Sequence, residues 1–251
     1  IKNLWFKKDG EIIRNEIRTL TQNLDDLPFP DRDLHDTQHY IDKSGTIDLI
    51  AGRGCPYQCS YCVEPTYQEV FADKGKFVRF RSVENVLDEI ADLQKRFKFT
   101  RINFVDDVFT IDLRWLREFA AAYQKRFKIP YTCNARIEAM REESYQLLRD
   151  SGCFTLEMGI ESGSENIRRT VLERKMTNKK IIESFDLAHQ YGLKTMSFNM
   201  VGIPRETLQD IDETIQLNRR LNPTSVLVSI FQPYPGTGLH KLCEENGWLN
   251  G

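Results

Sequence analysis

Three cysteines in one short loop could bind a metal centre. Cys55, Cys59 and Cys62 lie in the segment GCPYQCSYC, four and three residues apart. Thiolates bind iron and zinc, and three of them can hold three irons of an iron-sulfur cubane. The fourth iron then has no protein ligand and can chelate a small molecule through an amine and a carboxylate. The loop therefore indicates a cluster with one open iron.

S-adenosylmethionine (SAM) offers both of these groups on its methionine end. An electron from a reduced cluster can break a carbon-sulfur bond of its sulfonium and release a carbon radical, which no side chain can do. Two alternatives stay open on the spacing alone, a structural zinc site and an inert loop. Zinc usually needs a second cysteine pair or a clear fourth ligand, and none follows at knuckle spacing. A four-cysteine ferredoxin run is also missing from the sequence.

The elements around this loop are predicted from hydrophobic periodicity. From Ile47 onward, apolar runs alternate with amphipathic stretches, which is typical of strand-helix units on a parallel sheet. Strands are expected at 47–53, 101–105, 131–135, 155–160, 195–201 and 225–231, and helix caps at Ser82, Asp112 and Thr177. Six units are too few for a closed eight-unit barrel. The predicted fold is α/β, a partial (β/α)6 TIM-like barrel with its site at the carboxyl ends of the strands.

Residues 1–46 differ in texture from the rest of the chain. They contain a predicted hairpin between Leu4 and Ile13 around Asp9-Gly10, followed by a predicted extended linker at 24–36 with two prolines and five acidic residues. We expect this segment to follow a further domain upstream. Residues 47–251 are then the catalytic core.

Composition excludes some partners. The formal net charge of -2 and the pI near 6.2 provide no global basic field, so a nucleic-acid partner is not expected. No apolar run reaches the roughly 18 residues of a membrane helix, and no signal peptide opens the chain. The other cysteines, Cys133, Cys153 and Cys243, are dispersed, and the four histidines do not cluster. We expect a cytoplasmic protein without a membrane segment and without disulfides or histidine ligands.

Taken together, these features resemble the radical SAM superfamily, whose motif is CxxxCxxC with an aromatic residue, here Tyr61, before the last cysteine. The resemblance covers residues 47–250. Within the superfamily, the sequence resembles the cobalamin-binding branch most specifically. It rests on the stretches LPFPDRDL, VRFRSVENVLDEI, NFVDDVFT, GIESGSENI, GIPRET and PYPGTGL. Arg205 in GIPRET departs from the family, which often has glycine there.

The resemblance implies a set of ligands. Cys55, Cys59 and Cys62 would hold a 4Fe-4S cluster, SAM would bind beside it, and cobalamin would bind mainly outside this chain. Asp106 and Asp107 would receive the methionine ammonium, although helix-capping acids are the alternative for Asp107. The further cofactor-binding residues would be Tyr61 at the adenine, Glu161, Ser162 and Gly163 at the ribose and methionine carboxylate, and Gly202 and Pro204 at the adenine wall.

Two further assignments are weaker. Arg136, which follows the third strand, is a candidate partner for the ligand's carboxylate, with a structural ion pair as the alternative. Asn199 is a polar candidate near the fifth strand's end, and the loop with Tyr234, Pro235 and Gly236 is predicted to form the rim of the mouth, with a plain turn as the alternative.

The implied activity is reductive cleavage of SAM, followed by cobalamin-dependent methylation of an unactivated carbon. Radical cyclisation, oxidation or rearrangement without methyl transfer is the enzymatic alternative. An iron-sulfur electron-transfer or structural protein is the non-enzymatic one, which a polar pocket beside the cluster would disfavour. A small-molecule substrate and a flavodoxin- or ferredoxin-type reductant are the expected partners.

Overall fold

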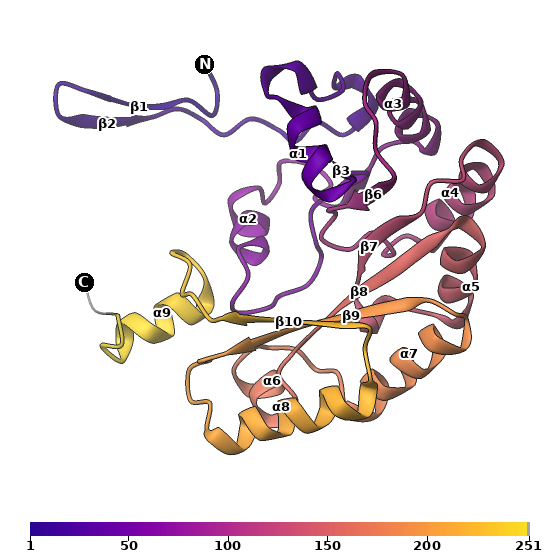
Figure 1. Cartoon of the computed structure of the whole chain (residues 1–251). Coiled ribbons are helices and arrows are strands. Elements are labelled where there is room, and N and C mark those ends of the chain that lie inside the picture. The colour runs from indigo at the N-terminus through magenta and orange to yellow at the C-terminus, as the bar shows by residue number, and fades with distance from the viewer. Residues whose placement is uncertain (250–251) are drawn as a thin grey trace.

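A curved sheet of six parallel strands forms the centre of the computed structural model, which describes residues 1–249 (Figure 1). The spatial order is β10-β9-β8-β7-β6-β3, so the sheet is open between its two edge strands. This arrangement confirms the predicted partial barrel. The strands are β3 (Thr46–Leu49), β6 (Arg101–Phe104), β7 (Tyr131–Ala135), β8 (Cys153–Glu161), β9 (Lys194–Val201) and β10 (Ser225–Ile230).

Helices cover the outer face of the curve (Figure 1). The predicted helix caps are confirmed. The side chains of Ser82, Asp112 and Thr177 each accept a hydrogen bond from an amide of the first turn of α3, α4 and α7. The helices are α1 (Thr37–Ser44), α2 (Glu64–Val70), α3 (Val83–Arg96), α4 (Leu113–Arg126), α5 (Glu142–Ser151), α6 (Glu165–Thr170), α7 (Asn178–Gln190), α8 (Leu208–Leu221) and α9 (Gly238–Glu245).

An aromatic cluster packs α4 onto strands β6 and β7. Phe119 lies with its ring centroid 5.5 Å from that of Phe104 and 5.2 Å from that of Trp115, and Phe109 meets it edge-on at 5.2 Å. Such pairs stabilise beyond the area they bury. Because Phe109 follows the acidic pair at the end of β6 by two residues, the cluster also anchors the loop on which that pair lies.

The first predicted strand is wrong at its carboxyl end. The sheet strand β3 stops at Leu49, and Gly52–Arg53 forms a separate strand, β4, which pairs antiparallel with β5 (Arg79–Phe80). The cause is the carboxylate of Asp106, which accepts hydrogen bonds from the backbone amides of Ala51 at 3.0 Å and of Gly52 at 2.5 Å. These amides therefore bond a side chain instead of a neighbouring strand, and the chain leaves the sheet early.

The N-terminal segment contains the predicted hairpin, formed by β1 (Trp5–Lys8) and β2 (Glu11–Arg14). All its strand residues are exposed, and it projects from the body of the molecule (Figure 1). The linker at 24–36 is less extended than predicted, because short 3-10 helices form at Leu24–Asp26 and Arg32–Leu34. Arg32 donates to the carbonyl of Asp48 at 2.8 Å, which ties the linker to β3.

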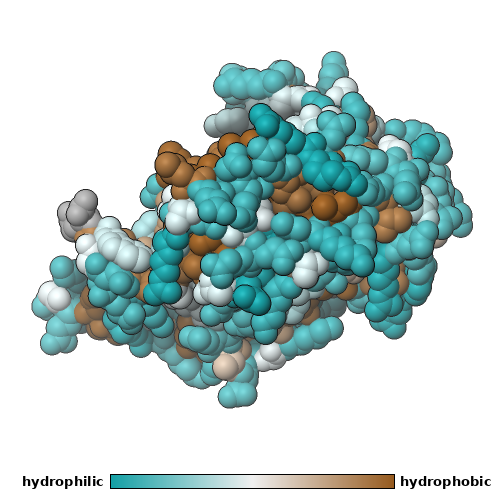
Figure 2. Space-filling model, turned by 90° about the horizontal axis from the view of Figure 1, so that it is seen from below, coloured by the Kyte–Doolittle hydropathy of each residue, from teal (hydrophilic) through white to brown (hydrophobic). Residues whose placement is uncertain are grey.

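Apolar side chains also reach the surface. Figure 2 shows them as patches among mostly hydrophilic residues on the face seen from below. On the edge strand β10, Val226, Leu227, Val228 and Ile230 are all exposed. Among the described residues, no helix is both long and apolar enough to cross a membrane.

We expect Phe119→Ala to lower the free energy of unfolding by about 3–5 kcal/mol, because it leaves a cavity at the centre of the aromatic cluster. Urea unfolding followed by circular dichroism measures this loss. The matched control is Phe154→Ala, whose ring is partly exposed, with a loss under about 1 kcal/mol. Equal losses in the two variants would contradict the placement of the core.

Candidate functional site

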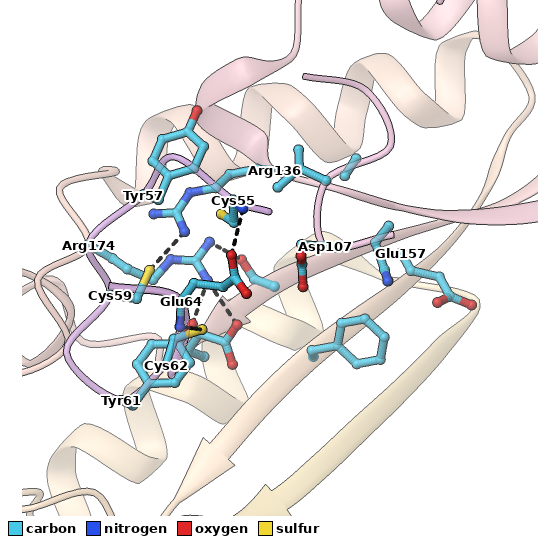
Figure 3. A pocket seen from close by; sticks show the side chains of 16 residues that line it. Cys55, Tyr57, Cys59, Tyr61, Cys62, Glu64, Asp107, Arg136, Glu157 and Arg174 are labelled. Carbon is cyan, nitrogen blue, oxygen red and sulfur yellow. Dashed lines mark hydrogen bonds and ion pairs between the residues drawn. The ribbon is translucent and has the colours of Figure 1, made fainter. Parts of the chain in front are cut away.

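A polar pocket of about 270 Å³ lies at the carboxyl ends of the strands (Figure 3). The loops after parallel strands meet at one edge of a sheet, which is why residues distant in sequence gather here. The lining residues come from the cysteine loop and the start of α2, from β7, β8 and β9, and from the loops after β6, β7 and α6. They are Cys55, Tyr57, Cys59, Tyr61, Cys62, Glu64, Asp107, Val108, Asn134, Ala135, Arg136, Glu157, Gly159, Glu161, Arg174 and Phe198.

The cysteine loop brings all three predicted thiols to this pocket. It begins at Gly54, whose φ of 84° and close approach to Phe77 (2.9 Å from an added Cβ) require glycine. The carboxylate of Glu64, which the sequence reasoning missed, accepts the amide of Cys55 at 2.7 Å. Within the loop, the amide of Cys62 bonds the carbonyl of Cys59 at 3.0 Å. The loop is therefore held by a hydrogen bond within itself and by another from the first residue of α2.

The chemistry of the thiols suits a cluster. Burial raises the pKa of Cys55 to about 11 and also raises the pKa of Cys62, so their thiolates form readily only beside a cation. Within residues 1–249, no three His, Cys, Asp or Glu side chains converge where one metal ion could sit. A cubane instead places each thiolate on a separate iron, so three thiols spread around one pocket match its donor set.

Two buried guanidinium groups face the thiols. Arg136 donates from Nη1 to the sulfur of Cys59 at 2.8 Å and from Nη2 to Glu138 at 2.9 Å. The Nε atoms of Arg136 and Arg174 are buried and have no hydrogen-bond partner among the described residues. The same is true of Oε2 of Glu138. Buried polar atoms are normally satisfied, so these orphaned atoms fit a pocket that receives a charged ligand.

Arg174 joins the cysteine loop to the end of β8. It donates to the hydroxyl of Tyr61 at 3.1 Å, to Glu161 at 2.8 Å and to the carbonyl of Gly159 at 2.8 Å. Arg174 carries no signal in the sequence, because it lies in the charged stretch ERK between α6 and α7, which is typical of a surface loop. The predicted ligand residues Tyr61 and Glu161 thus share one buried cation.

Glu161 occupies an unusual backbone conformation at the carboxyl end of β8. Its φ is 68°, in the left-handed region, and the pairing register with β9 shifts between Gly159 and Glu161. Burial raises the pKa of Glu161, while the charge of Arg174 lowers it. A left-handed non-glycine residue costs of order 1–3 kcal/mol, and such strain is concentrated at functional sites.

Ser162 and Gly163 lie outside the pocket, against α8. The hydroxyl of Ser162 accepts the amide of Ser164 at 3.2 Å, and the amide of Gly163 donates to Thr214 at 2.7 Å. A Cβ on Gly163 would lie 2.3 Å from the carbonyl oxygen of Glu213, so glycine is needed there for packing. Their assignment to the ribose stays a prediction, and their observed contacts are structural.

The two acids after β6 point to different places. Asp106 is 2% exposed and its carboxylate is occupied by the amides of Ala51 and Gly52, so the structure does not bring it to the pocket. Asp107 lines the pocket on the side away from Arg174, where Glu157 also lies (Figure 3). Of the pair, only Asp107 lines the pocket.

The remaining predicted residues lie farther out. Gly202 and Pro204 line a separate cavity with Phe231, not the cysteine pocket. Asn199 is buried and bonds Asn218 at 2.8 Å, so its amide supports the β9-α8 packing. In the rim loop Tyr234 is exposed, and the carbonyl of Gly236 accepts from Thr66 on α2 at 2.8 Å.

Glu157 was also missed, although a signal for it existed. Glu157, Gly159 and Glu161 occupy alternate positions in the strand TLEMGIE, and the residues between them are apolar. Because alternate residues of a strand share one face, two carboxylates four residues apart predict a polar face turned into the barrel. Tyr57 and Phe198 carry no comparable signal.

Comparisons with known proteins agree with this geometry. A family model described as the radical SAM superfamily matches residues 49–217. An uncharacterized methyltransferase of Pyrococcus horikoshii is 28% identical over 99% of this chain and 53% of its own length. The chain thus spans about half the length of this relative.

Two solved structures share the fold. The radical SAM methyltransferase TsrM from Kitasatospora setae, with cobalamin and a 4Fe-4S cluster bound, matches 84% of this chain and 41% of its own with a TM-score of 0.72 and 19% identity. The cobalamin-dependent SAM radical enzyme OxsB, with aqua-cobalamin and SAM bound, matches 97% of this chain and 41% of its own with a TM-score of 0.73 and 17% identity.

The buried carboxyl of Asp106 gives a pH-dependent prediction. Burial raises its pKa to about 6 from an ordinary value of 3.8, against the pull of two backbone amides. The folded state therefore binds this proton more tightly than the unfolded chain, and folding is favoured as pH falls through the folded pKa. We expect the free energy of unfolding of the wild type, minus that of Asp106→Asn, to rise between about pH 7 and about pH 4.

Urea unfolding of both proteins at a series of pH values measures this difference. Subtracting the variant removes titrations that the two proteins share. A difference that stays flat or falls on acidification would contradict the burial of Asp106.

Proposed function

The chain belongs to the radical SAM superfamily of enzymes, and we propose that it holds a 4Fe-4S cluster on Cys55, Cys59 and Cys62 and cleaves SAM reductively beside it. One observation carries the proposal. The three thiols of the CxxxCxxC loop, at the top of the first strand of an open parallel barrel, line one pocket with buried cations and carboxylates. A pocket with groups of both charges suits a zwitterionic ligand such as SAM.

Enzymes of this superfamily use a 4Fe-4S cluster and SAM. When bound, the cluster supplies the electron that breaks a carbon-sulfur bond of the sulfonium and yields a 5'-deoxyadenosyl radical. The residues of this chain bind and orient the ligand. In this proposal Asp107 receives the methionine ammonium, because it is a pocket carboxylate that forms no ion pair with an arginine and lies near Cys55 and Cys62, and charge-assisted hydrogen bonds are strong.

Glu161 and Tyr61 orient the nucleoside part of the ligand. The carboxylate of Glu161 is fixed by Arg174 and keeps lone pairs that can accept from ribose hydroxyls. Tyr61 is fixed by the same guanidinium, so its ring is a preorganised wall for the adenine. Because one buried cation orients both groups, the nucleoside binds to a surface that does not need to rearrange.

We further propose that the radical serves cobalamin-dependent methylation of an unactivated carbon in a small molecule. The methyltransferase name of the Pyrococcus horikoshii relative and the fold shared with two cobalamin-dependent enzymes support this. Cobalamin would bind mainly outside residues 1–251. A flavodoxin- or ferredoxin-type protein would supply the electron.

The test is anaerobic reconstitution with iron and sulfide, reduction with dithionite, and measurement of 5'-deoxyadenosine from SAM. We expect product from the wild type and from Cys243→Ala, a buried cysteine of α9 that does not line the pocket, and background levels from Cys59→Ala. Iron content should fall in Cys59→Ala alone.

A reconstituted wild type that holds zinc, or that holds a full cluster and leaves SAM intact, would refute the proposal. Loss of product in Cys243→Ala as well would point to a folding defect instead of a lost ligand.

A further inference from the structure

We propose that Arg136 is a positioning residue that raises the reduction potential of the cluster by donating a hydrogen bond to the Cys59 thiolate. The inference rests on the proposed function and deepens it. It concerns how readily the site accepts an electron, which neither the fold nor the motif determines.

Three contacts fix the guanidinium of Arg136, and two of the partners, Cys59 and Tyr57, are labelled in Figure 3. Nη1 lies 2.8 Å from the sulfur of Cys59, and Nη2 lies 2.9 Å from Oε1 of Glu138. Its central carbon lies 3.8 Å from the centroid of the Tyr57 ring, within the range of a cation-π interaction. The side chain is nine-tenths buried, so solvent does little to screen its charge.

A buried cation beside a cluster ligand shifts the redox equilibrium. One-electron reduction adds negative charge that is shared between a cluster and its thiolates. A guanidinium on one of these sulfurs stabilises the reduced state more than the oxidised state, since the attraction grows with the charge on sulfur. Hydrogen bonds to the sulfurs are among the determinants of cluster potentials, and reduction becomes easier in their presence.

Glu138 provides a partner of opposite sign. It bonds Arg136 through Oε1, and its Oε2 lies 3.8 Å from Arg174 and has no hydrogen-bond donor among the described residues. Its negative charge offsets part of the field of both arginines. Removing the charge of Glu138 should therefore favour the reduced state, whereas removing that of Arg136 should disfavour it.

The sequence-based assignment of Arg136 to the carboxylate of SAM makes a different prediction. Both terminal nitrogens of Arg136 already have partners, and Nε is the one left without any. If Arg136 binds the ligand, its loss raises the dissociation constant of SAM and leaves the potential of the SAM-free cluster unchanged. The two roles can thus be separated.

The experiment is a redox titration of the anaerobically reconstituted protein without SAM, followed by electron paramagnetic resonance of the reduced cluster. The variants are Arg136→Gln, Arg136→Lys and Glu138→Gln. Arg114→Gln is the matched control, because this arginine is exposed on α4 and its side chain has no ion pair or hydrogen bond among residues 1–249. Iron content, thermal unfolding and the dissociation constant of SAM are measured for each.

We expect Arg136→Gln to lower the ratio of reduced to oxidised cluster at a fixed potential at least tenfold, which is about 59 mV for one electron. Arg136→Lys should restore most of this ratio, because it keeps the charge. Glu138→Gln should shift the potential upward, and Arg114→Gln should leave it unchanged.

An unchanged potential in Arg136→Gln, with or without weaker SAM binding, would overturn the inference. Shifts of Arg136→Gln and Glu138→Gln in the same direction would also overturn it, since they indicate general disturbance of the pocket. If Arg136→Gln fails to retain iron, the reduction potential of Glu138→Gln decides: an upward shift supports the inference, and an unchanged or lower potential overturns it. The wild type could bind the cluster and make 5'-deoxyadenosine while the variants keep its reduction potential. This result would refute the inference and leave the proposed function standing.

Discussion

The carboxylate of Asp106 bonds the amides of Ala51 and Gly52, and the rest of the site depends on this contact. It ends the first sheet strand at Leu49 and directs the following residues into the short β4-β5 ladder. The cysteine loop then starts from a fixed point above the sheet instead of continuing along it. A side chain in the loop after the second sheet strand, β6, thus determines where the loop after the first can hold its thiols, which links the site to the packing of the barrel.

Charge balance is the second constraint on the pocket. Arg136 and Arg174 are buried near each other, which would be unfavourable without anions close by. Glu138 and Glu161 supply part of the compensation, and the sulfur of Cys59 accepts a bond that is strongest when it is ionised. The same groups that keep the pocket stable without a ligand therefore prepare it for thiolates and for a zwitterion. The orphaned atoms mark where this compensation is incomplete.

Much of the fold could be predicted, because strand periodicity and helix caps are local signals. The three cysteines were predictable for the same reason. The direction of side chains at strand ends could not be predicted. Asp106 and Asp107 are adjacent and identical in type, yet Asp106 is buried with its carboxylate bonded to backbone amides, whereas Asp107 faces the pocket. Arg174 was also beyond prediction, because its role comes from the packing of a loop against β8. The contacts of Ser162 and Gly163 with α8 were not predictable either, because they depend on how a distant helix packs against the end of β8.

The left-handed backbone at Glu161 has a consequence for protein engineering. Glycine or asparagine at this position would relax the backbone strain. Either substitution would also remove the carboxylate that pairs with the buried guanidinium of Arg174, which costs stability in turn. The two effects oppose each other, so a search for stabilising substitutions that considers backbone geometry alone would choose this position wrongly.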